Sequence, residues 1–273
     1  MKGLKKIGKA FVVAFSLYSK IPMPRFNWES EDMKYHLCFF PWVGAVVGAL
    51  EVLWYQFCIG RMIGTFAFVM VALAIPILIT GGFHLDGFMD TCDALHSYQD
   101  REKKLEILKD PHIGAFAVIC LAAYLLLAAG AVGIIYEMSL QRVFSIAENR
   151  IMFVRAIVPV GLSFFLSRAL SGISVVTLPG AKKKGMLQTE SDTAGKKTVL
   201  IFLVLQVLAV AVGLLVLNLI LGALILLAAA ISYGYYWYMS KKQFGGITGD
   251  QAGYFVCLTE LLILIAVAGY FLM

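Results

Sequence analysis

Charged residues are scarce in this sequence. Asp, Glu, Lys and Arg make up 15% of its 273 residues, and 60% of the residues are hydrophobic, whereas soluble domains average about 25% charged residues. This composition excludes an ordinary soluble domain, and several apolar runs are long enough to cross a hydrocarbon core of ~30 Å. The sequence therefore predicts an all-α, polytopic integral membrane protein with about seven transmembrane helices. The candidate spans are residues 35–57, 62–80, 113–136, 150–170, 198–217, 219–239 and 251–272.

Paired cysteines and a signal-peptide cleavage site are also missing. The five cysteines are scattered without a C-x-x-C pair, so we expect neither a disulfide framework nor a zinc site. Residues 3–20 begin with lysines and continue with an apolar stretch, but no small-x-small cleavage site follows. We therefore expect a retained N-terminal interfacial or re-entrant helix. Because no internal repeat or low-complexity segment divides the chain, residues 1–273 are interpreted as one transmembrane helical domain.

The positive charges, which give a net charge of +6, are distributed unevenly. If the N-terminus is cytoplasmic, threading seven spans places 18 of the 23 Lys and Arg residues on the cytoplasmic side and two on the outer side. This is the positive-inside pattern. The excess of basic residues is therefore explained by membrane topology and by contact with lipid headgroups. It gives no reason to expect a nucleic-acid partner. The cytoplasmic side also receives three polar loops, at about 81–112, 171–197 and 240–250.

The first of these loops concentrates carboxylates. Asp86, Asp90 and Asp93 stand at i, i+4 and i+7, so a helix would project all three from one face. Two carboxylates about 6 Å apart repel by roughly 2–3 kcal/mol at an effective dielectric near 20, and a divalent cation would turn this repulsion into attraction. Mg²⁺ suits the cluster because it takes oxygen ligands and relies on one or two carboxylates plus substrate phosphate. The alternative is a solvated acidic face.

The spacing of the trio limits how it could bind metal. Asp86 and Asp93 are about 10.5 Å apart along a helix axis, so they cannot easily chelate one small ion. Asp90 lies between them and can bridge. We therefore expect either two cations on the helix face, or one cation with an outer Asp in a hydrogen-bonding role. On the opposite face the segment from Leu85 to Leu95 is apolar at helical period, and Asp100 is the expected N-cap of a following short helix.

A second loop on the same side is rich in glycine. The segment Phe244–Asp250 reads FGGITGD, in which glycines let backbone N–H groups approach a phosphate closely and Thr248 adds a hydroxyl. Asp250 occupies the position of an N-cap for the last span, and its alternative role is a fourth acid for a metal or a nucleophile. The glycines are Gly245, Gly246 and Gly249.

Other candidates have competing structural explanations. Asp110, at the exit of the first loop, can serve as ligand or general base, or can end the preceding helix. His84 and His112 are lone histidines near the membrane surface, a position that is more often structural than catalytic. The stretch Lys182–Lys184 can hold a polyanion or contact lipid. Within the spans polar groups such as Arg168 are few, either functional or in a structural ion pair, whereas a transporter would carry more of them at mid-membrane depth.

Together these segments resemble cobalamin synthase, the family of membrane-bound adenosylcobinamide-GDP ribazoletransferases. The resemblance covers nearly the full length and is strongest at Gly81–Gly87, which reads GGFHLDG, with the acids that follow. The chain departs from the family pattern at Ala94, where glycine is usual, at Pro111–His112, where a small polar residue and arginine are usual, and at Ala115 in place of threonine. The remaining matching segments are Ile21–Pro24, Phe40–Gly44, Leu105–Asp110, Ile113–Gly114, Ser167–Arg168, Leu178–Pro179, Gly185 and Phe244–Asp250.

The resemblance implies a reaction and a compartment. The enzyme would join α-ribazole or its 5′-phosphate to adenosylcobinamide-GDP with release of GMP, at the cytoplasmic face of a bacterial or archaeal cytoplasmic (inner) membrane. It implies Mg²⁺ held by Asp86, Asp90 and Asp93, with Asp86 and Asp90 also counted as catalytic and Asp110 or Asp250 as the group that takes the hydroxyl proton. The number of subunits, one chain or a homo-oligomer, stays open. The implied substrate-binding residues are His84, Lys109, Arg168, Lys184, Gly245, Gly246, Thr248 and Gly249.

Two other enzyme classes share part of the pattern. CDP-alcohol phosphotransferases carry D-G-x-x-A-R-x8-G-x3-D-x3-D, but here Asp90–Thr91 replaces Ala-Arg and Asp100 stands in place of the later glycine. UbiA-like prenyltransferases carry N-D-x-x-D-x-x-x-D, but Leu85 precedes Asp86 and the spacing differs. The CDP-alcohol type is the stronger alternative of the two, and a transporter remains the alternative from another class.

Overall fold

The computed structural model describes residues 2–29, 31–142, 151, 153–181 and 186–273. Helices dominate this described part, and it contains no β-strand. Six of its helices are long and apolar enough to cross a membrane, and α3 and α4, which form a pair bent by 95°, add a seventh candidate. The predicted all-α membrane fold is therefore confirmed. The membrane-length helices and α3 are α2 (Phe40–Arg61), α3 (Thr65–Thr80), α6 (Ala115–Arg142), α8 (Val158–Thr177), α10 (Lys196–Leu217), α11 (Leu219–Met239) and α12 (Gly249–Leu272).

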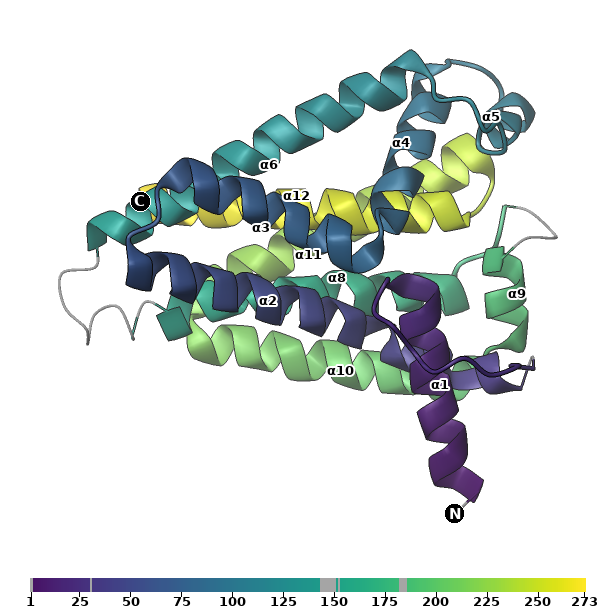
Figure 1. The fold of residues 1–273 in the computed structure, drawn as a ribbon. Coiled ribbons are helices and arrows are strands. Elements are labelled where there is room, and N and C mark those ends of the chain that lie inside the picture. Colours follow the sequence, from purple (N-terminus) through teal and green to yellow (C-terminus); the bar gives the residue numbers. More distant parts are fainter. Residues whose placement is uncertain (1, 30, 143–150, 152, 182–185) are drawn as a thin grey trace.

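Most of the shorter elements gather at one end of the bundle. Figure 1 shows the long helices running side by side, with the C-terminus at the far end. We call the end that carries α1, α4, α5, α9 and residues 240–248 the loop end. The predicted N-terminal helix is present there as α1. The short elements of the chain are α1 (Lys2–Tyr18), η1 (Asp32–Phe39), α4 (Phe83–His96), α5 (Arg101–Ile107), η2 (Phe153–Ile157), α9 (Met186–Thr193) and η3 (Ser240–Phe244).

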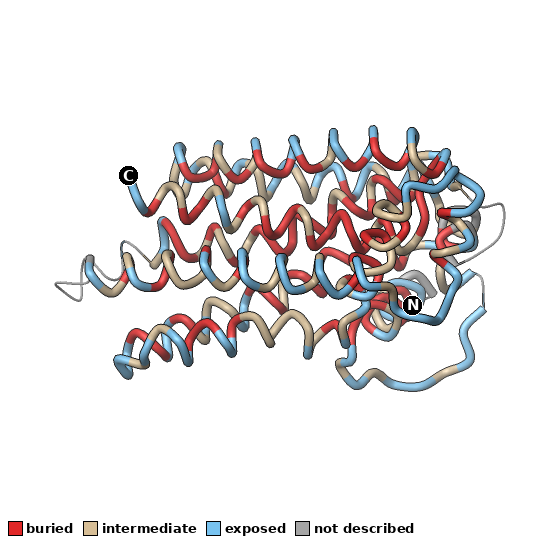
Figure 2. The backbone as a smooth tube through the Cα atoms, turned by 90° about the horizontal axis from the view of Figure 1, so that it is seen from above, coloured by how far each residue is buried: buried red, intermediate tan, exposed pale blue. Residues whose placement is uncertain are grey.

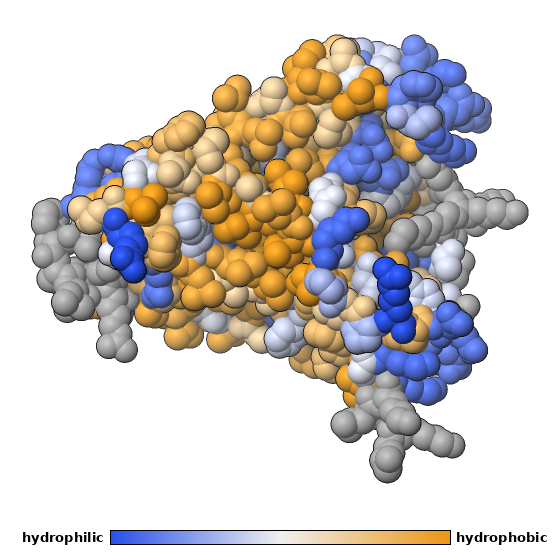
Figure 3. Space-filling model, viewed as in Figure 1, coloured by the Kyte–Doolittle hydropathy of each residue, from blue (hydrophilic) through white to orange (hydrophobic). Residues whose placement is uncertain are grey.

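The long helices expose apolar side chains in the way that a bilayer requires. In the most apolar stretch of α8, 72% of the residues are buried, whereas the corresponding figure is 17% for both α6 and α10. Helix α8 is therefore central, and α6 and α10 present large apolar surfaces that no described part of the protein covers. Figure 2 shows buried residues inside the bundle and many exposed residues along its outer turns. Figure 3 shows a broad hydrophobic middle and hydrophilic side chains gathered mainly at the loop end. A soluble monomer rarely exposes so much contiguous apolar surface.

Several observed boundaries differ from the expected spans, and α6 for instance ends at Arg142 rather than near residue 136. The first membrane helix begins at Phe40 rather than near residue 35, because residues Asp32–Phe39 form a 3₁₀ helix. The fourth continues to Thr177 rather than ending near residue 170, so the second polar loop starts later than predicted. Bare glycines hold this helix against α2. A Cβ built on Gly48 would stand 2.0 Å from the Gly161 carbonyl oxygen, which is the close backbone approach that small residues permit between membrane helices.

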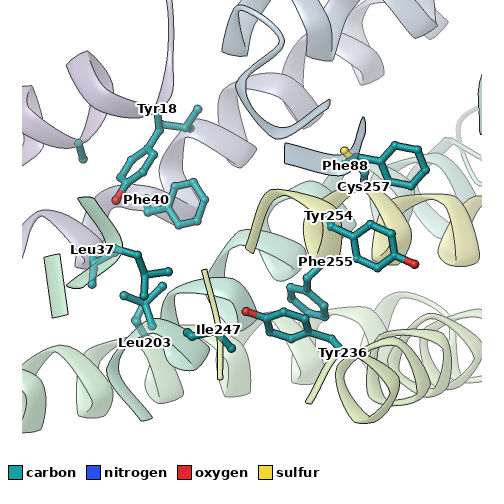
Figure 4. Close-up of a cluster of buried hydrophobic side chains, with 14 of the residues drawn as sticks. Tyr18, Leu37, Phe40, Phe88, Leu203, Tyr236, Ile247, Tyr254, Phe255 and Cys257 are labelled. Atoms are coloured by element: carbon teal, nitrogen blue, oxygen red, sulfur yellow. The ribbon is translucent and has the colours of Figure 1, made fainter. Parts of the chain in front are cut away.

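An aromatic core fixes the loop end to the bundle. Figure 4 shows Tyr18 and Phe40 on one side, and Phe88, Tyr254 and Phe255 on the other. The rings of Phe88 and Tyr254 stack with centroids 5.4 Å apart, so the apolar face of α4 lies on α12. Since aromatic pairs of this kind add about 0.5–1.5 kcal/mol beyond the area that they bury, the core sets the position of α4 and leaves its acidic face outward.

A hydrogen bond joins two of the peripheral helices. Tyr18, at the end of α1, donates its hydroxyl to Glu190 Oε1 of α9 at 2.9 Å. Burial raises the pKa of Glu190 to about 7. The contact ties the N-terminal helix to the second polar loop, although the two are far apart in sequence.

A sharp bend separates α3 from α4. Gly81 and Gly82 both have positive φ, 67° and 78°, a conformation that glycine adopts without steric cost. Their N–H groups both donate to the carbonyl oxygen of Ile77, which ends α3 as a Schellman-type cap. The chain then restarts as α4 at an angle of 95°. The predicted end of the second span at residue 80 and the helix predicted from Leu85 to Leu95 are both confirmed.

Candidate active site

Helices α4 and α12 cross in backbone contact at the loop end. A Cβ built on Gly87 would stand 2.6 Å from the carbonyl oxygen of Asp250, and one built on Gly253 would stand 2.9 Å from the carbonyl oxygen of His84. Only residues without a side chain allow helices to approach so closely. The crossing brings the start of α12, with Asp250, directly beside the acidic helix.

The predicted acids share one neighbourhood at this crossing. Asp90 is partly buried. Burial raises the pKa of Asp90 to about 6, and the negative charges of Asp86, Asp250 and Asp93 add to this effect, in that order. Because α4 runs at 95° to α3 and crosses the start of α12, this cluster lies at the loop end of the bundle. Asp250, which the sequence offered as a possible fourth acid, lies close enough for its charge to act on Asp90, although it comes 160 residues later in the chain.

Asp93 makes a second contact that the other acids lack. A Cβ built on Gly114 would fall 2.0 Å from both carboxylate oxygens of Asp93, so this carboxylate lies against the start of α6. Negative charge is favoured at a helix N-terminus, which gives Asp93 a structural explanation beside its predicted one. Asp86 and Asp90 remain the pair that the outward face of α4 presents.

The acidic cluster supplies the oxygen donors that Mg²⁺ prefers. Within the described residues, no three side chains of His, Cys, Asp or Glu are grouped so that they could hold a metal ion. Mg²⁺ is usually bound by only one or two carboxylates, and waters and substrate phosphates complete the shell. Asp86 and Asp90 are hard oxygen donors, and the neighbouring negative charges add to the effect of burial in raising the pKa of Asp90. The residues present therefore fit a magnesium ion with two protein ligands better than one with three.

The glycine loop is closed by its own hydrogen bonds. The N–H groups of Gly245 and Gly246 both donate to the carbonyl oxygen of Ser240. Ile247 then forms an isolated parallel bridge with Gly180, through its N–H to Pro179 at 2.9 Å. The structure thus assigns the N–H groups of Gly245 and Gly246 to the loop itself rather than to a phosphate cradle. The N–H of Gly249 lies in the first turn of α12, where backbone donors lack a partner within the helix.

The cap of α12 differs from the prediction. Thr248 is the N-cap, and its hydroxyl accepts from the N–H of Gln251 at 3.3 Å. Asp250 is not the cap but lies in the first helical turn, where the helix dipole favours a carboxylate. Thr248 also donates to Asp250 Oδ2 at 3.5 Å, so the two residues are coupled. Asp100, in contrast, caps α5 as predicted, because its side chain accepts from the N–H of Lys103.

Lys109 and Asp110 lie on the exposed surface of the first loop. Asp110 Oδ1 accepts from the backbone N–H of His112 at 3.0 Å and lies 2.6 Å from its ring Nδ1. The backbone bond is the largest reason that the pKa of Asp110 is lowered from its ordinary value, followed by the side-chain bond. Asp110 is therefore an ionised surface carboxylate already engaged with His112, in a setting unlike that of Asp90.

Two predicted substrate-binding residues lie inside the bundle instead. Arg168 is 1% exposed and forms an ion pair with Glu260, while Nη1 also donates to the Phe164 carbonyl oxygen at 2.9 Å. His84, which is 5% exposed, stacks on the ring of Phe40. Both side chains line a cavity of ≈ 100 Å³. His84 lies on α4 just before Asp86, but its ring is buried against Phe40 rather than on the acidic face. Lys184 lies outside the described residues.

Three cations near the site were missed by sequence reasoning. Lys20 and Asp86 line a cavity of ≈ 550 Å³ between α1 and the bend after α3. Arg101 lies against Gly245, and Lys104 is buried with its ammonium on Gln243. One signal was available for Lys104. It lies four residues before Leu108, on the face of α5 that packs inward.

Comparison with known proteins identifies the family of this chain. The family model described as cobalamin-5-phosphate synthase matches residues 10–268. The chain belongs to the cobalamin-5-phosphate synthase family. It is 39% identical to an adenosylcobinamide-GDP ribazoletransferase of Lachnoclostridium phytofermentans, over 93% of this chain and 91% of the relative. Proteins of the same name are 31% identical in Clostridium perfringens, over 94% of this chain and 96% of the relative, and 30% identical in Klebsiella pneumoniae, over 94% and 98%. No solved structure matches.

Membership of the cobalamin-5-phosphate synthase family confirms the resemblance inferred from the sequence motifs. The matched region includes α4, the first loop and the glycine loop, which are the segments that carry the candidate site. The individual roles of these residues stay predictions.

Proposed function

We propose that this chain is an adenosylcobinamide-GDP ribazoletransferase. It joins α-ribazole or α-ribazole 5′-phosphate to adenosylcobinamide-GDP and releases GMP, which is the step that attaches the lower ligand in cobalamin biosynthesis. Family membership supports the reaction. The observation that carries the site is the crossing of α4 and α12, where Asp86, Asp90 and Asp250 meet beside the glycine loop.

The reaction is a phosphoryl transfer. A ribose hydroxyl attacks the phosphorus nearer the corrinoid, a new P–O bond forms, and the diphosphate P–O bond breaks so that GMP leaves with the bonding electrons. Such a displacement depends on positioning and on neutralising charge as it moves to the leaving phosphate. Asp86 and Asp90 would hold Mg²⁺, which when bound supplies that neutralisation.

The protein must also accept the proton of the attacking hydroxyl. Asp250 and Asp110 are the two candidates. Asp250 is favoured because it lies in the same acidic neighbourhood as Asp90, whereas Asp110 is held on the loop surface by His112. A base must reach its proton at about 2.6–3.2 Å or through one water, and a residue beside the metal-binding pair meets this condition more readily.

We also propose the compartment. The loop end carries most of the Lys and Arg residues of the chain, and positive charge marks the cytoplasmic side of bacterial membrane proteins. The site would then face the cytoplasm across the inner membrane surface, where nucleotide-linked substrates are found.

One assay tests the proposal. Membranes containing the protein are incubated with Mg²⁺, adenosylcobinamide-GDP and α-ribazole, and GMP and the cobalamin product are measured by chromatography. Asp86→Ala and Asp90→Ala should abolish turnover while the protein still inserts. Glu102→Ala, an exposed acid on α5, is the matched control and should leave activity unchanged. Full activity in both Asp variants would refute the metal role, and CMP release from a CDP-alcohol would favour the phosphotransferase alternative.

A further inference from the structure

Lys104 is a buried ammonium without a counter-charge. It is 6% exposed, although it belongs to a short helix whose other charged residues are exposed. Its Nζ donates to Gln243 Oε1 at 2.5 Å. Among the residues that the structure describes, no carboxylate lies within 4.0 Å of it. Burying a charge against a neutral amide alone is costly, so the site is electrostatically incomplete.

A second cation lies one turn earlier on the same helix. Arg101 and Lys104 are three residues apart and therefore share a face of α5. A Cβ built on Gly245 would stand 2.8 Å from Arg101 Nη1 and 3.0 Å from its Cζ. The guanidinium thus lies directly on the glycine, which also has φ of 80°. Arg101 makes no ion pair with any described residue.

Arg101 and Lys104 contact the glycine loop through Gly245 and Gln243. This loop leads into the first turn of α12, where α4 crosses in backbone contact. A phosphate group whose metal ion contacts the acids of α4 would therefore present its remaining oxygens toward the two cations.

We propose that Arg101, Lys104 and the Gly245 turn form a phosphate-binding site. The inference rests on the proposed function, because phosphate is the group that both substrates can bring to this loop. The sources are the diphosphate of adenosylcobinamide-GDP and the 5′-phosphate of α-ribazole 5′-phosphate. The bare Gly245 lets a phosphate oxygen reach the guanidinium, and Gln243 holds the Lys104 ammonium toward the same turn.

Steady-state kinetics with purified full-length protein in nanodiscs test this site. Arg101→Gln and Lys104→Met should raise the KM for the phosphate-bearing substrate about tenfold or more, the loss that corresponds to one charge-assisted hydrogen bond. The matched control is Lys103→Gln, because Lys103 is exposed on the same helix and pairs with Glu106. Its KM values should stay within about twofold of wild type, as a surface ion pair contributes little.

The KM of each substrate is measured separately, because the two substrates carry different phosphate groups. A rise in KM for adenosylcobinamide-GDP alone identifies its diphosphate as the ligand. A rise for α-ribazole 5′-phosphate, with none for unphosphorylated α-ribazole, identifies the 5′-phosphate instead. If both variants leave every KM at the wild-type value, the proposal is overturned.

A binding readout separates ligand contact from a structural role. Inorganic pyrophosphate with Mg²⁺ should raise the Tm of the wild type and of Lys103→Gln, but not that of Arg101→Gln. Lys104→Arg should restore part of the shift that Lys104→Met loses. Equal shifts in all variants would make Lys104 a structural residue and end the proposal. If the wild type releases no GMP but shows a pyrophosphate-dependent rise in Tm that Arg101→Gln loses, the proposed reaction is refuted and the phosphate site is retained.

Discussion

The α-carbon of Gly87 lies against the main chain of Asp250, so that any Cβ at position 87 would stand 2.6 Å from the Asp250 carbonyl oxygen and 2.9 Å from its Cα. This contact brings Asp250 to the acids of α4, so that Asp90 and Asp250 belong to one cluster although most of the sequence separates them. The relationship depends on the absence of a single side chain.

Gly87→Ala should therefore reduce turnover by at least about tenfold. The added methyl group meets backbone rather than a flexible side chain, so α4 must move away from α12, and a misplacement of about 1 Å can cost on the order of 100-fold in rate. Initial rates of GMP release measure the effect. Gly130→Ala is the control, since nothing lies within 4 Å of its Cβ position. Wild-type rates in Gly87→Ala would show that the crossing tolerates expansion.

The metal-free protein should become more stable as the pH falls from about 6 to about 4. Burial and the neighbouring acids raise the pKa of Asp90 from 3.8 to about 6, so in this window the folded state binds more protons than the unfolded state, and stability decreases as pH rises. The effect is modest because Asp90 is partly exposed. Thermal unfolding in detergent with EDTA should show a higher Tm at pH 7 for Asp90→Asn, and a weaker pH dependence. An identical pH profile in Asp90→Asn and wild type would contradict this explanation.

Asp250→Asn should reduce kcat far more than Asp110→Asn. Asp250 shares the acidic cluster, whereas Asp110 is exposed and bound to His112. General bases contribute typically 10²–10⁴-fold, so the loss in Asp250→Asn should lie in that range, with Asp110→Asn within about tenfold of wild type. Rates at saturating substrate distinguish kcat from binding. The reverse order would assign proton acceptance to the first loop.

Breaking the Arg168–Glu260 pair should destabilise the bundle without a specific effect on substrate affinity. Removing one member of a buried pair leaves an uncompensated charge and costs about 3–5 kcal/mol, so Glu260→Leu should strongly lower the unfolding midpoint. Arg168→Met combined with Glu260→Leu should recover much of that loss, as measured by unfolding in mixed micelles. A raised KM in Arg168→Met at unchanged stability would instead restore its predicted role in substrate binding.

The membrane fold could be predicted from the sequence because long apolar runs determine it. Span boundaries were correct to within a few residues at α10, α11 and α12, where turn residues or charges flank the runs. They were wrong where Asp32–Phe39 formed a 3₁₀ helix and where α8 continued to Thr177, because local hydropathy does not report which polar residues a bundle can bury.

The candidate site was predicted only in part, from helical periodicity and from the family motif rather than from hydropathy. The acids of α4 could be placed on one face by helical periodicity alone, and the family motif added the glycine loop. The sequence offered Asp250 as a partner of these acids, but it did not predict the contacts of single side chains between other distant segments. Arg168 was assigned to substrate because no periodicity pairs it with Glu260, and Arg101 was overlooked because nothing in the local sequence shows that it lies on Gly245.

The bend at Gly81–Gly82 leaves α3 with 16 residues, a length of about 24 Å at 1.5 Å per residue. A typical hydrocarbon core is ~30 Å thick, and a short span is accommodated by thinning of the surrounding lipid. We expect the bilayer to dip toward the acidic helix there. Headgroups would then sit level with the catalytic face, and turnover in vesicles should fall as acyl chains lengthen.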